Sequence, residues 1–144
     1  MDACTFIGHK DTPWEVKGKV SSQIETLITK FGVDTFYVGT HGNFDRIVYD
    51  SLCQLENKYE IKICVVLAYL NGKPEWYDLS KTVFPARLDN VPPRYAINKR
   101  NQYMIERSKY MICYVDNTQT NAYAFAEMAN KKGLLVFNLG QVKI

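Results

Sequence analysis

Three groups of polar residues each follow a strand-like apolar run in this chain. They are Gly8-His9-Lys10, the turn from Gly39 to Asp45, and the turn from Thr118 to Asn121. The second and third groups lead directly into a helical pattern, and the first does so after a short Pro/Trp loop. Open α/β folds bind ligands just outside the carboxyl ends of their parallel strands, so we expect the groups to converge on one edge of a sheet. They predict a site for a phosphate-bearing or nucleotide-like molecule.

The turn from Gly39 to Asp45 offers the most varied chemistry. Gly39 and Gly42 let the backbone approach a ligand. Thr40 and Asn43 add a hydroxyl and an amide at the start of a helix, whose positive end attracts phosphate. Asp45 either complements the helix dipole or accepts a hydrogen bond from a ribose hydroxyl. A tight turn with an N-cap explains the same residues equally well.

The same turn excludes two common nucleotide-binding motifs. It matches neither G-x-x-x-x-G-K-[ST] nor G-x-G-x-x-G. The sequence therefore supports neither an ATPase nor an ordinary dinucleotide dehydrogenase.

The other two groups supply hydrogen-bond donors. His9 and Lys10, beside Gly8, can neutralise a phosphate or donate hydrogen bonds to it, although a histidine in a loop is more often a satisfied polar residue. Thr118, Thr120 and Asn121 present hydroxyl and amide groups at a helix start, where a simple N-cap would look the same. We predict that these residues bind the ligand.

Two arginines extend the predicted site. Arg94 follows the rigid pair Pro92-Pro93, and Arg100 lies further along the same expected helix. A planar guanidinium at either position suits a phosphate or a purine ring, whereas the alternative is a solvated charge on a helix. We predict that both arginines bind the ligand.

A recognised catalytic or metal-binding pattern is missing from the sequence. His9 and His41 have no metal-ligand spacing with the scattered carboxylates, and nothing resembles a Ser-His-Asp triad or a Cys-x-x-Cys redox pair. We expect no metal, no cofactor and, on balance, no catalysis. In an enzyme, Asp45 or Glu127 would supply the carboxylate that stabilises a ribosyl oxocarbenium-like transition state. Glu127 is more simply explained as part of a solvated helical face.

Composition narrows the class of protein. The chain has 144 residues, of which 47% are apolar and 23% charged, and this predicts one domain over residues 1–144. The 18 Lys and Arg residues exceed the 15 Asp and Glu residues by only 3 charges and are mostly scattered, so nucleic acid is not an expected partner. The four cysteines have no short spacing and are interpreted as buried thiols. Without a signal-peptide pattern or an apolar run of about 20 residues, we expect a cytoplasmic protein that does not bind membranes.

The apolar periodicity alternates between strand and helix. Strands are expected over residues 3–7, 35–38, 61–69, 109–115 and 134–139, and helices over 17–31, 44–55, 95–107 and 122–132. Gly32 and Gly133 are expected to end the first and last helices. The order predicts a three-layer α/β/α, Rossmann-like, doubly wound and mostly parallel sheet of about five strands. Residues 70–93, which include Asn71-Gly72-Lys73-Pro74, lack a clear period and predict a functional flap.

Several motifs together resemble one protein family. The opening run is Cys4-Thr5-Phe6-Ile7-Gly8-His9-Lys10, and it is similar to the C-x-F-T-G-H-R start of the YpsA-like group in the SLOG superfamily, which is named for the Smf/DprA and LOG proteins. The resemblance continues over nearly the whole chain, through Phe36-Tyr37-Val38-Gly39, Gly42-x-Phe44-Asp45, Phe84-Pro85, Pro93-Arg94-Tyr95-Ala96-Ile97, Lys99-Arg100-Asn101, Ile112-Cys113-Tyr114-Val115 and Ala129-x-Lys131-Lys132-Gly133.

This resemblance implies binding of a nucleotide or nucleotide-derived ligand by the loops after the first, second and penultimate strands. SLOG relatives include phosphoribohydrolases, single-stranded DNA binders and sensors of ADP-ribose-type signals in antiphage defence. The chain departs from the family in two places. It lacks the P-G-G-x-G-T-x-x-E motif of the LOG enzymes, and Thr120-Asn121 stand where the YpsA-like pattern has Gly-Gly. The second change replaces backbone room with side-chain donors, which implies altered specificity.

Three functions follow as hypotheses. The first is non-catalytic binding of a signal such as cyclic ADP-ribose or a cyclic nucleotide, by a sensor or by a sequestering sponge in the conflict between phages and bacteria. The second is a LOG-like N-glycosidase or phosphoribohydrolase. The third is a regulator that binds a protein partner through its surface and the segment from Tyr69 to Pro93. Relatives of this fold often dimerise, so we expect a homo-oligomer in each case.

Overall fold

Strand β1 (Asp2–Gly8) lies inside a six-stranded sheet with the order β4-β3-β2-β1-β5-β6. The computed structural model describes residues 2–70 and 76–144. The other strands are β2 (Val33–Val38), β3 (Lys62–Val66), β4 (Thr82–Val83), β5 (Tyr110–Tyr114) and β6 (Leu135–Asn138). Every pairing is parallel, which confirms the predicted α/β, Rossmann-like class. The sixth strand, β4, is a two-residue edge strand within the segment that was expected to be irregular.

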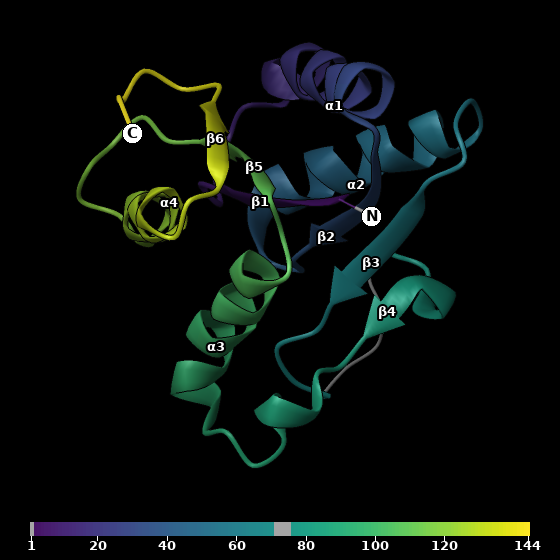
Figure 1. Cartoon of the computed structure of the whole chain (residues 1–144). Helices are drawn as coiled ribbons and strands as arrows, with labels where there is room; N and C mark the ends of the chain where they lie inside the picture. The colour runs from purple at the N-terminus through teal and green to yellow at the C-terminus, as the bar shows by residue number, and fades with distance from the viewer. Residues whose placement is uncertain (1, 71–75) are drawn as a thin grey trace.

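Within residues 2–70 and 76–144, four α-helices cover the two faces of the sheet. They are α1 (Lys17–Phe31), α2 (Gly42–Glu56), α3 (Pro93–Glu106) and α4 (Asn121–Lys131). Figure 1 shows α1 and α2 on one side of the sheet and α3 and α4 on the other. Successive strands move away from β1 in one direction up to β4, and the chain then returns to place β5 on the other side of β1. The strand order therefore reverses between β1 and β5, and such reversals are where open α/β sheets bind ligands.

Helix α1 shows how the sequence pattern determines an element. Val20, Ile24 and Leu27 are spaced to fall on one helical face, and all three are fully buried. Gly32 adopts the left-handed conformation with φ 69°, and its N–H bonds to the carbonyl of Leu27. Since a side chain is unfavourable in that conformation, Gly32 ends the helix where the sequence predicts.

Both faces of the sheet are buried, as helices on each side require. Along β5, Ile112 packs into the core beneath α1 and α2, while its neighbours Met111 and Cys113 pack against α4. This alternation follows from the two-residue period of a strand. Burial raises the pKa of the Cys113 thiol to about 12, so this buried thiol is unreactive.

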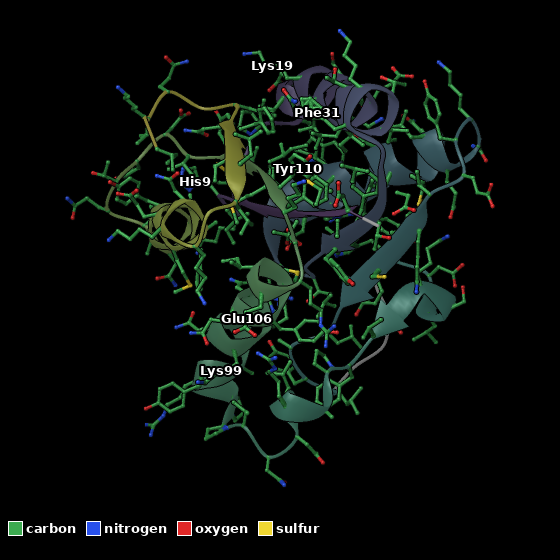
Figure 2. The ribbon with its side chains drawn as sticks, in the orientation of Figure 1. His9, Lys19, Phe31, Lys99, Glu106 and Tyr110 are labelled. Atoms are coloured by element: carbon green, nitrogen blue, oxygen red, sulfur yellow. The ribbon has the colours of Figure 1, made fainter. Side chains whose placement is uncertain are left out.

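The amino-terminal edge of the sheet is closed by aromatic packing. Phe31, the last residue of α1, lies against Tyr110 at the start of β5, with ring centroids 5.7 Å apart (Figure 2). The carboxyl edge, at the opposite end of the strands, holds the candidate site.

Residues 78–81 of the segment expected to form a flap contact α2. The backbone N–H of Asp78 donates to the Tyr49 hydroxyl at 2.9 Å, and Lys81 pairs with Glu56 at 2.7 Å. The run Asn71-Gly72-Lys73-Pro74 lies outside the described residues. None of the described helices has the length and apolar character needed to cross a membrane.

Candidate functional site

A cavity of about 510 Å³ opens at the carboxyl end of β1, between the loops that follow β1, β2 and β5. Its volume lies within the range of small-molecule sites, roughly 300–1,000 Å³. The lining residues come from the end of β1, the start of α2, one face of α3 and the start of α4: Phe6, Ile7, Gly8, His9, Lys10, Asp11, His41, Asp45, Ile97, Arg100, Asn101, Met104, Thr120, Asn121 and Ala122.

Two glycines allow the loops after β1 and β2 to meet. A Cβ on Gly8 would overlap the Phe44 ring, so only glycine lets α2 approach the end of β1. Gly42 has φ 90°, and a Cβ there would lie 2.5 Å from the Cα of Lys10. The backbone N–H of Asn43 then donates to the carbonyl of Lys10 at 2.9 Å. Gly42 and Asn43 therefore build the wall of the cavity.

His9 connects the loops after β1 and β5. Its Nε2 accepts a hydrogen bond of 2.9 Å from the backbone N–H of Asp116, and its ring meets Tyr114 edge-on. Nε2 must be unprotonated to accept this bond, so the neutral ring carries its proton on Nδ1. His9 lines the cavity near α4 (Figure 2).

The guanidinium of Arg100 is buried at the cavity wall, with 2% of the residue exposed. Its Nε donates to Asn101 Oδ1 at 2.8 Å, and its Nη1 donates to the carbonyl of Val66 at 3.0 Å and to Thr40 Oγ1 at 3.2 Å. Its Nη2 has one longer contact of 3.5 Å, to His41 Nδ1. Arg100 therefore joins α3 to the ends of β2 and β3 and keeps donor capacity at Nη2.

Asp45 is the second buried charge of the site, with 8% of the residue exposed. Its Oδ2 accepts a hydrogen bond of 2.9 Å from the backbone N–H of His41. Burial raises the pKa of Asp45 to about 6, against the opposing influence of the Arg100 charge and of this hydrogen bond. Asp45 is thus a carboxyl group that can exchange a proton near neutral pH.

Gly39 lets these two charges come together at the end of β2. A Cβ on Gly39 would lie 2.8 Å from Asp45 Oδ2 and 3.0 Å from Arg100 Cζ. Real Cβ atoms do not tolerate such contacts with two buried, hydrogen-bonded side chains. The geometry therefore requires glycine at this position although Gly39 does not line the cavity.

His41 lies beside Arg100 in its neutral form. Packing around the ring, followed by the nearby Arg100 charge, lowers the pKa of His41. An arginine can only donate, so the contact with Arg100 makes Nδ1 an acceptor and leaves the proton on Nε2. Nε2 lies 3.0 Å from the hydroxyl of Tyr69, to which it donates.

The start of α4 forms the opposite wall. Thr120 is the N-cap of α4, and its Oγ1 accepts a hydrogen bond of 3.2 Å from the backbone N–H of Tyr123. The same hydroxyl donates to the carbonyl of Asn117 at 2.9 Å. Thr120 therefore acts as an N-cap, which is one of the two alternatives left open by the sequence, and it also lines the cavity.

The predicted ligand-binding residues fall into three sets. Those that line the cavity are Gly8, His9, Lys10, Asp45, Arg100, Thr120 and Asn121. Those that support the wall are Gly39, Thr40, Gly42 and Asn43.

Arg94 and Thr118 form the third set, which lies away from the lining. Both are exposed, and the Arg94 guanidinium stacks on the ring of Tyr95 with 4.8 Å between Cζ and the centroid. Glu127 also lies elsewhere on α4, where it accepts a hydrogen bond of 2.9 Å from the Tyr123 hydroxyl.

Several lining residues were not predicted to bind the ligand. His41 belongs to a turn that the sequence singled out, and Asp11 directly follows the group Gly8-His9-Lys10, but neither was selected. On α3, Ile97, Asn101 and Met104 share one face with Arg100, at the three- and four-residue spacing of a helix. This face could have been identified from the sequence as part of a site, because an arginine and an asparagine interrupt an otherwise apolar helical face.

Comparisons with known proteins identify a solved structure with a similar fold. No protein-family profile and no curated protein matches this sequence. Among solved structures, the chain is similar to DNA processing protein A (DprA) from Streptococcus pneumoniae, with a TM-score of 0.68 and 14% sequence identity. The match covers 96% of this chain and 50% of that one, so the chain spans about half the length of the DprA protein. At this identity the similarity shows the fold alone, a Rossmann-like sheet similar to the one in DprA.

Proposed function

We propose that this chain binds a nucleotide-derived ligand in the cavity at the carboxyl edge of the sheet and releases it unchanged, as a sensor or a sequestering protein would. The observation behind the proposal is the buried guanidinium of Arg100 on the wall of a cavity of about 510 Å³, at the point where the strand order reverses. Binding sites of open α/β sheets occur at this position, and a buried guanidinium offers a polar ligand planar hydrogen-bond donors in a fixed place.

The lining suits a molecule with both apolar and anionic parts. Phe6, Ile97 and Met104 supply apolar surface for a base or a sugar. At the rim, Lys10 and the first residues of α4 supply a cation and a helix N-terminus, which together favour phosphate. His9 adds a directional donor. These groups match the parts of a nucleotide and explain why we favour this ligand class.

Asp45 supports a second candidate, the N-glycosidase. Its carboxyl lines the cavity with a pKa of about 6, as a general acid or a stabiliser of a ribosyl cation needs. Asp11, the other lining carboxylate, is exposed, and Glu127 is bonded to Tyr123. Most glycosidases use two carboxylates that flank the bond to be cleaved, so a single buried carboxylate favours binding over hydrolysis.

The finer assignments belong to the same proposal. The sequence motifs favour the YpsA-like group within SLOG, and the ligand class favours a role with signalling nucleotides, including those of antiphage defence. A homo-oligomer and a protein partner are further expectations. Sedimentation of the purified chain tests the first, and affinity capture from its host tests the second.

A thermal-shift panel followed by mass spectrometry tests the function. The panel contains mononucleotides, ADP-ribose, cyclic ADP-ribose isomers and cyclic dinucleotides. A ligand at a hundredfold excess over its dissociation constant stabilises the folded state by about 2.7 kcal/mol. Recovery of an intact ligand supports binding, and recovery of a free base supports the N-glycosidase. A flat panel would reject both and favour the protein-partner hypothesis.

A pair of arginine variants provides the internal control. Arg100→Lys keeps the charge but loses the planar fork, and we expect it to abolish most of the shift. Arg94→Lys alters an exposed arginine on the same helix and should leave the shift unchanged. Equal shifts in both variants would place the ligand elsewhere.

A further inference from the structure

The buried end of the cavity holds two opposite charges that do not pair. Asp45 and Arg100 approach the same point beside Gly39 to within 3.0 Å, yet the ion pairs found among the described residues do not include one between them. Each charge instead bonds to neutral groups of the wall. A bound group that both accepts and donates hydrogen bonds can complete this arrangement.

Three side-chain atoms at this end keep hydrogen-bonding capacity. In the described part of the chain, no buried side-chain nitrogen or oxygen lacks a partner. Asp45 Oδ1 and Asn101 Nδ2 have no described hydrogen bond, and both residues are buried and line the cavity. These two atoms must therefore be open to the cavity space. With Arg100 Nη2, they form a set of one acceptor and two donors.

The charge of the lining argues against a phosphate at this end. Lys10 and Arg100 are balanced by Asp11 and Asp45, so the lining carries no net positive charge. A phosphate on Arg100 Nη2 would lie next to the Asp45 carboxylate, where the repulsion between like charges is strong because water is largely excluded. Lys10 and the N-terminus of α4 offer a phosphate a better place at the rim.

The structure assigns the buried end to the vicinal diol of a ribose, an inference that rests on the proposed function. One hydroxyl donates to Asp45 Oδ1, and the two hydroxyl oxygens accept from Arg100 Nη2 and Asn101 Nδ2. A guanine edge would need two carboxylate acceptors side by side, but Asp45 Oδ2 is already bonded to the His41 N–H. The ligand class is therefore a phosphorylated ribonucleoside with a free 2′,3′-diol, bound with its sugar inward and its phosphate at the rim.

Calorimetry with matched ribose and deoxyribose probes tests the assignment. The probes are AMP, GMP, CMP and UMP, their 2′-deoxy and 3′-deoxy analogues, and ribose 5-phosphate against 2-deoxyribose 5-phosphate. A site built to hydrogen-bond a hydroxyl rejects the analogue that lacks it, so we expect the ribose form to bind roughly 100-fold or more tightly. Equal affinity within each pair would overturn the diol assignment and leave the proposed function standing. Affinity that depends only on the base would mean that the buried end binds the edge of a base, and it would overturn the diol assignment. If no probe binds, the diol assignment and the proposed binding of a ribonucleotide are both overturned.

Two variants separate recognition of the diol from recognition of the phosphate. Asp45→Asn keeps an acceptor for the His41 N–H but turns a donor toward the cavity, so the ratio of ribose to deoxyribose affinity should fall to about one. Lys10→Ala should weaken both probes of a pair alike and leave the ratio unchanged. A ratio preserved in Asp45→Asn would contradict the assignment. If Asp45→Asn fails to fold, the probe series on the unaltered chain still supports or overturns the diol assignment.

Discussion

Two turns at the carboxyl edge of the sheet look alike in sequence but differ in where their hydrogen-bond and charge partners come from. Both join a strand to a helix through small polar residues. In the turn after β5, Asn117 Oδ1 accepts from the Gln119 N–H at 2.8 Å, and Thr120 donates to the Asn117 carbonyl at 2.9 Å. In the turn after β2, Asp45 bonds to only one local group, and its neighbour Arg100 comes from α3. Asn117 and Thr120 in the first turn bond to neighbouring residues, whereas Asp45 in the second turn lies beside a charge from a distant part of the chain.

The difference shows which polar atoms remain free to form hydrogen bonds with a ligand. Local hydrogen bonds give the turn after β5 a defined shape and occupy the side-chain oxygens of Asn117 and Thr120. The turn after β2 instead holds buried charges whose bonds are incomplete, an arrangement that lowers stability and suits a ligand. Four substitutions, ordered by their expected effect, test this contrast.

Arg100→Met should have the largest effect. It removes the donors to Val66 and Thr40 and leaves Asp45 as an uncompensated buried carboxylate, so the free energy of unfolding should fall by about 3–5 kcal/mol. Urea denaturation measures the change. Arg94→Met is the matched control, with an expected change within about 0.5 kcal/mol. A loss below about 1 kcal/mol for Arg100→Met would mean that the two turns do not differ in this way.

Gly39→Ala should rank second. Its Cβ would lie 2.8 Å from Asp45 Oδ2, and overpacking of this kind destabilises by about 1–3 kcal/mol. Ligand binding should be lost as well, because Asp45 and Arg100 must move. Gly18→Ala is the control, since a Cβ at this position in α1 has no neighbour within 4 Å. It should stabilise the chain by about 0.5–1 kcal/mol, and a stabilising Gly39→Ala would refute the close approach.

The raised pKa of Asp45 should produce a smaller effect, which is a dependence of the free energy of unfolding on pH. The folded-state pKa of about 6 lies above the ordinary value of 3.8, so the folded state binds the extra proton between these values. The contribution of Asp45 to stability is therefore larger at pH 5 than at pH 8, by about 1 kcal/mol. The lowered pKa of His41 acts in the opposite direction, so the quantity to measure is the difference between the unaltered chain and Asp45→Asn. A difference in stability that does not vary with pH would show that folding does not shift the pKa of Asp45.

Thr120→Ala should have the smallest effect of the four. It removes the N-cap of α4 and the bond to the Tyr123 N–H, which lowers stability by about 1 kcal/mol or less. Because the Thr120 hydroxyl already bonds to Asn117 and Tyr123, the ratio of ribose to deoxyribose affinity should stay constant. A changed ratio in calorimetry would make Thr120 a direct ligand contact and remove the contrast between the turns.

The fold was predictable because its signals are local. The α1 helix over residues 17–31, its end at Gly32 and the alternation of strands and helices follow from periodicity and turn residues. The β4 strand was not predictable, because two residues such as Thr82–Val83 are too few to show a period.

The site was only partly predictable for the opposite reason. Arg94 and Arg100 look equivalent in the sequence, yet one is exposed and the other is buried against Gly39, far away along the chain. Neither the contact nor the donor that Asn101 turns toward the cavity follows from the neighbouring residues. Both depend on how α3 docks on the sheet.

The position of β1 inside the sheet has a consequence for how the molecule opens. β1 pairs with β2 from Asp2 to Thr5 and with β5 from Cys4 to Gly8, whereas β4 is held by two residue pairs at an outer edge. Amide hydrogen exchange should therefore be slowest in β1 and fast in β4. The loop that holds His9 and Lys10 is attached to the most persistent strand of the sheet, so this wall of the cavity should outlast partial unfolding that begins at the β4 edge.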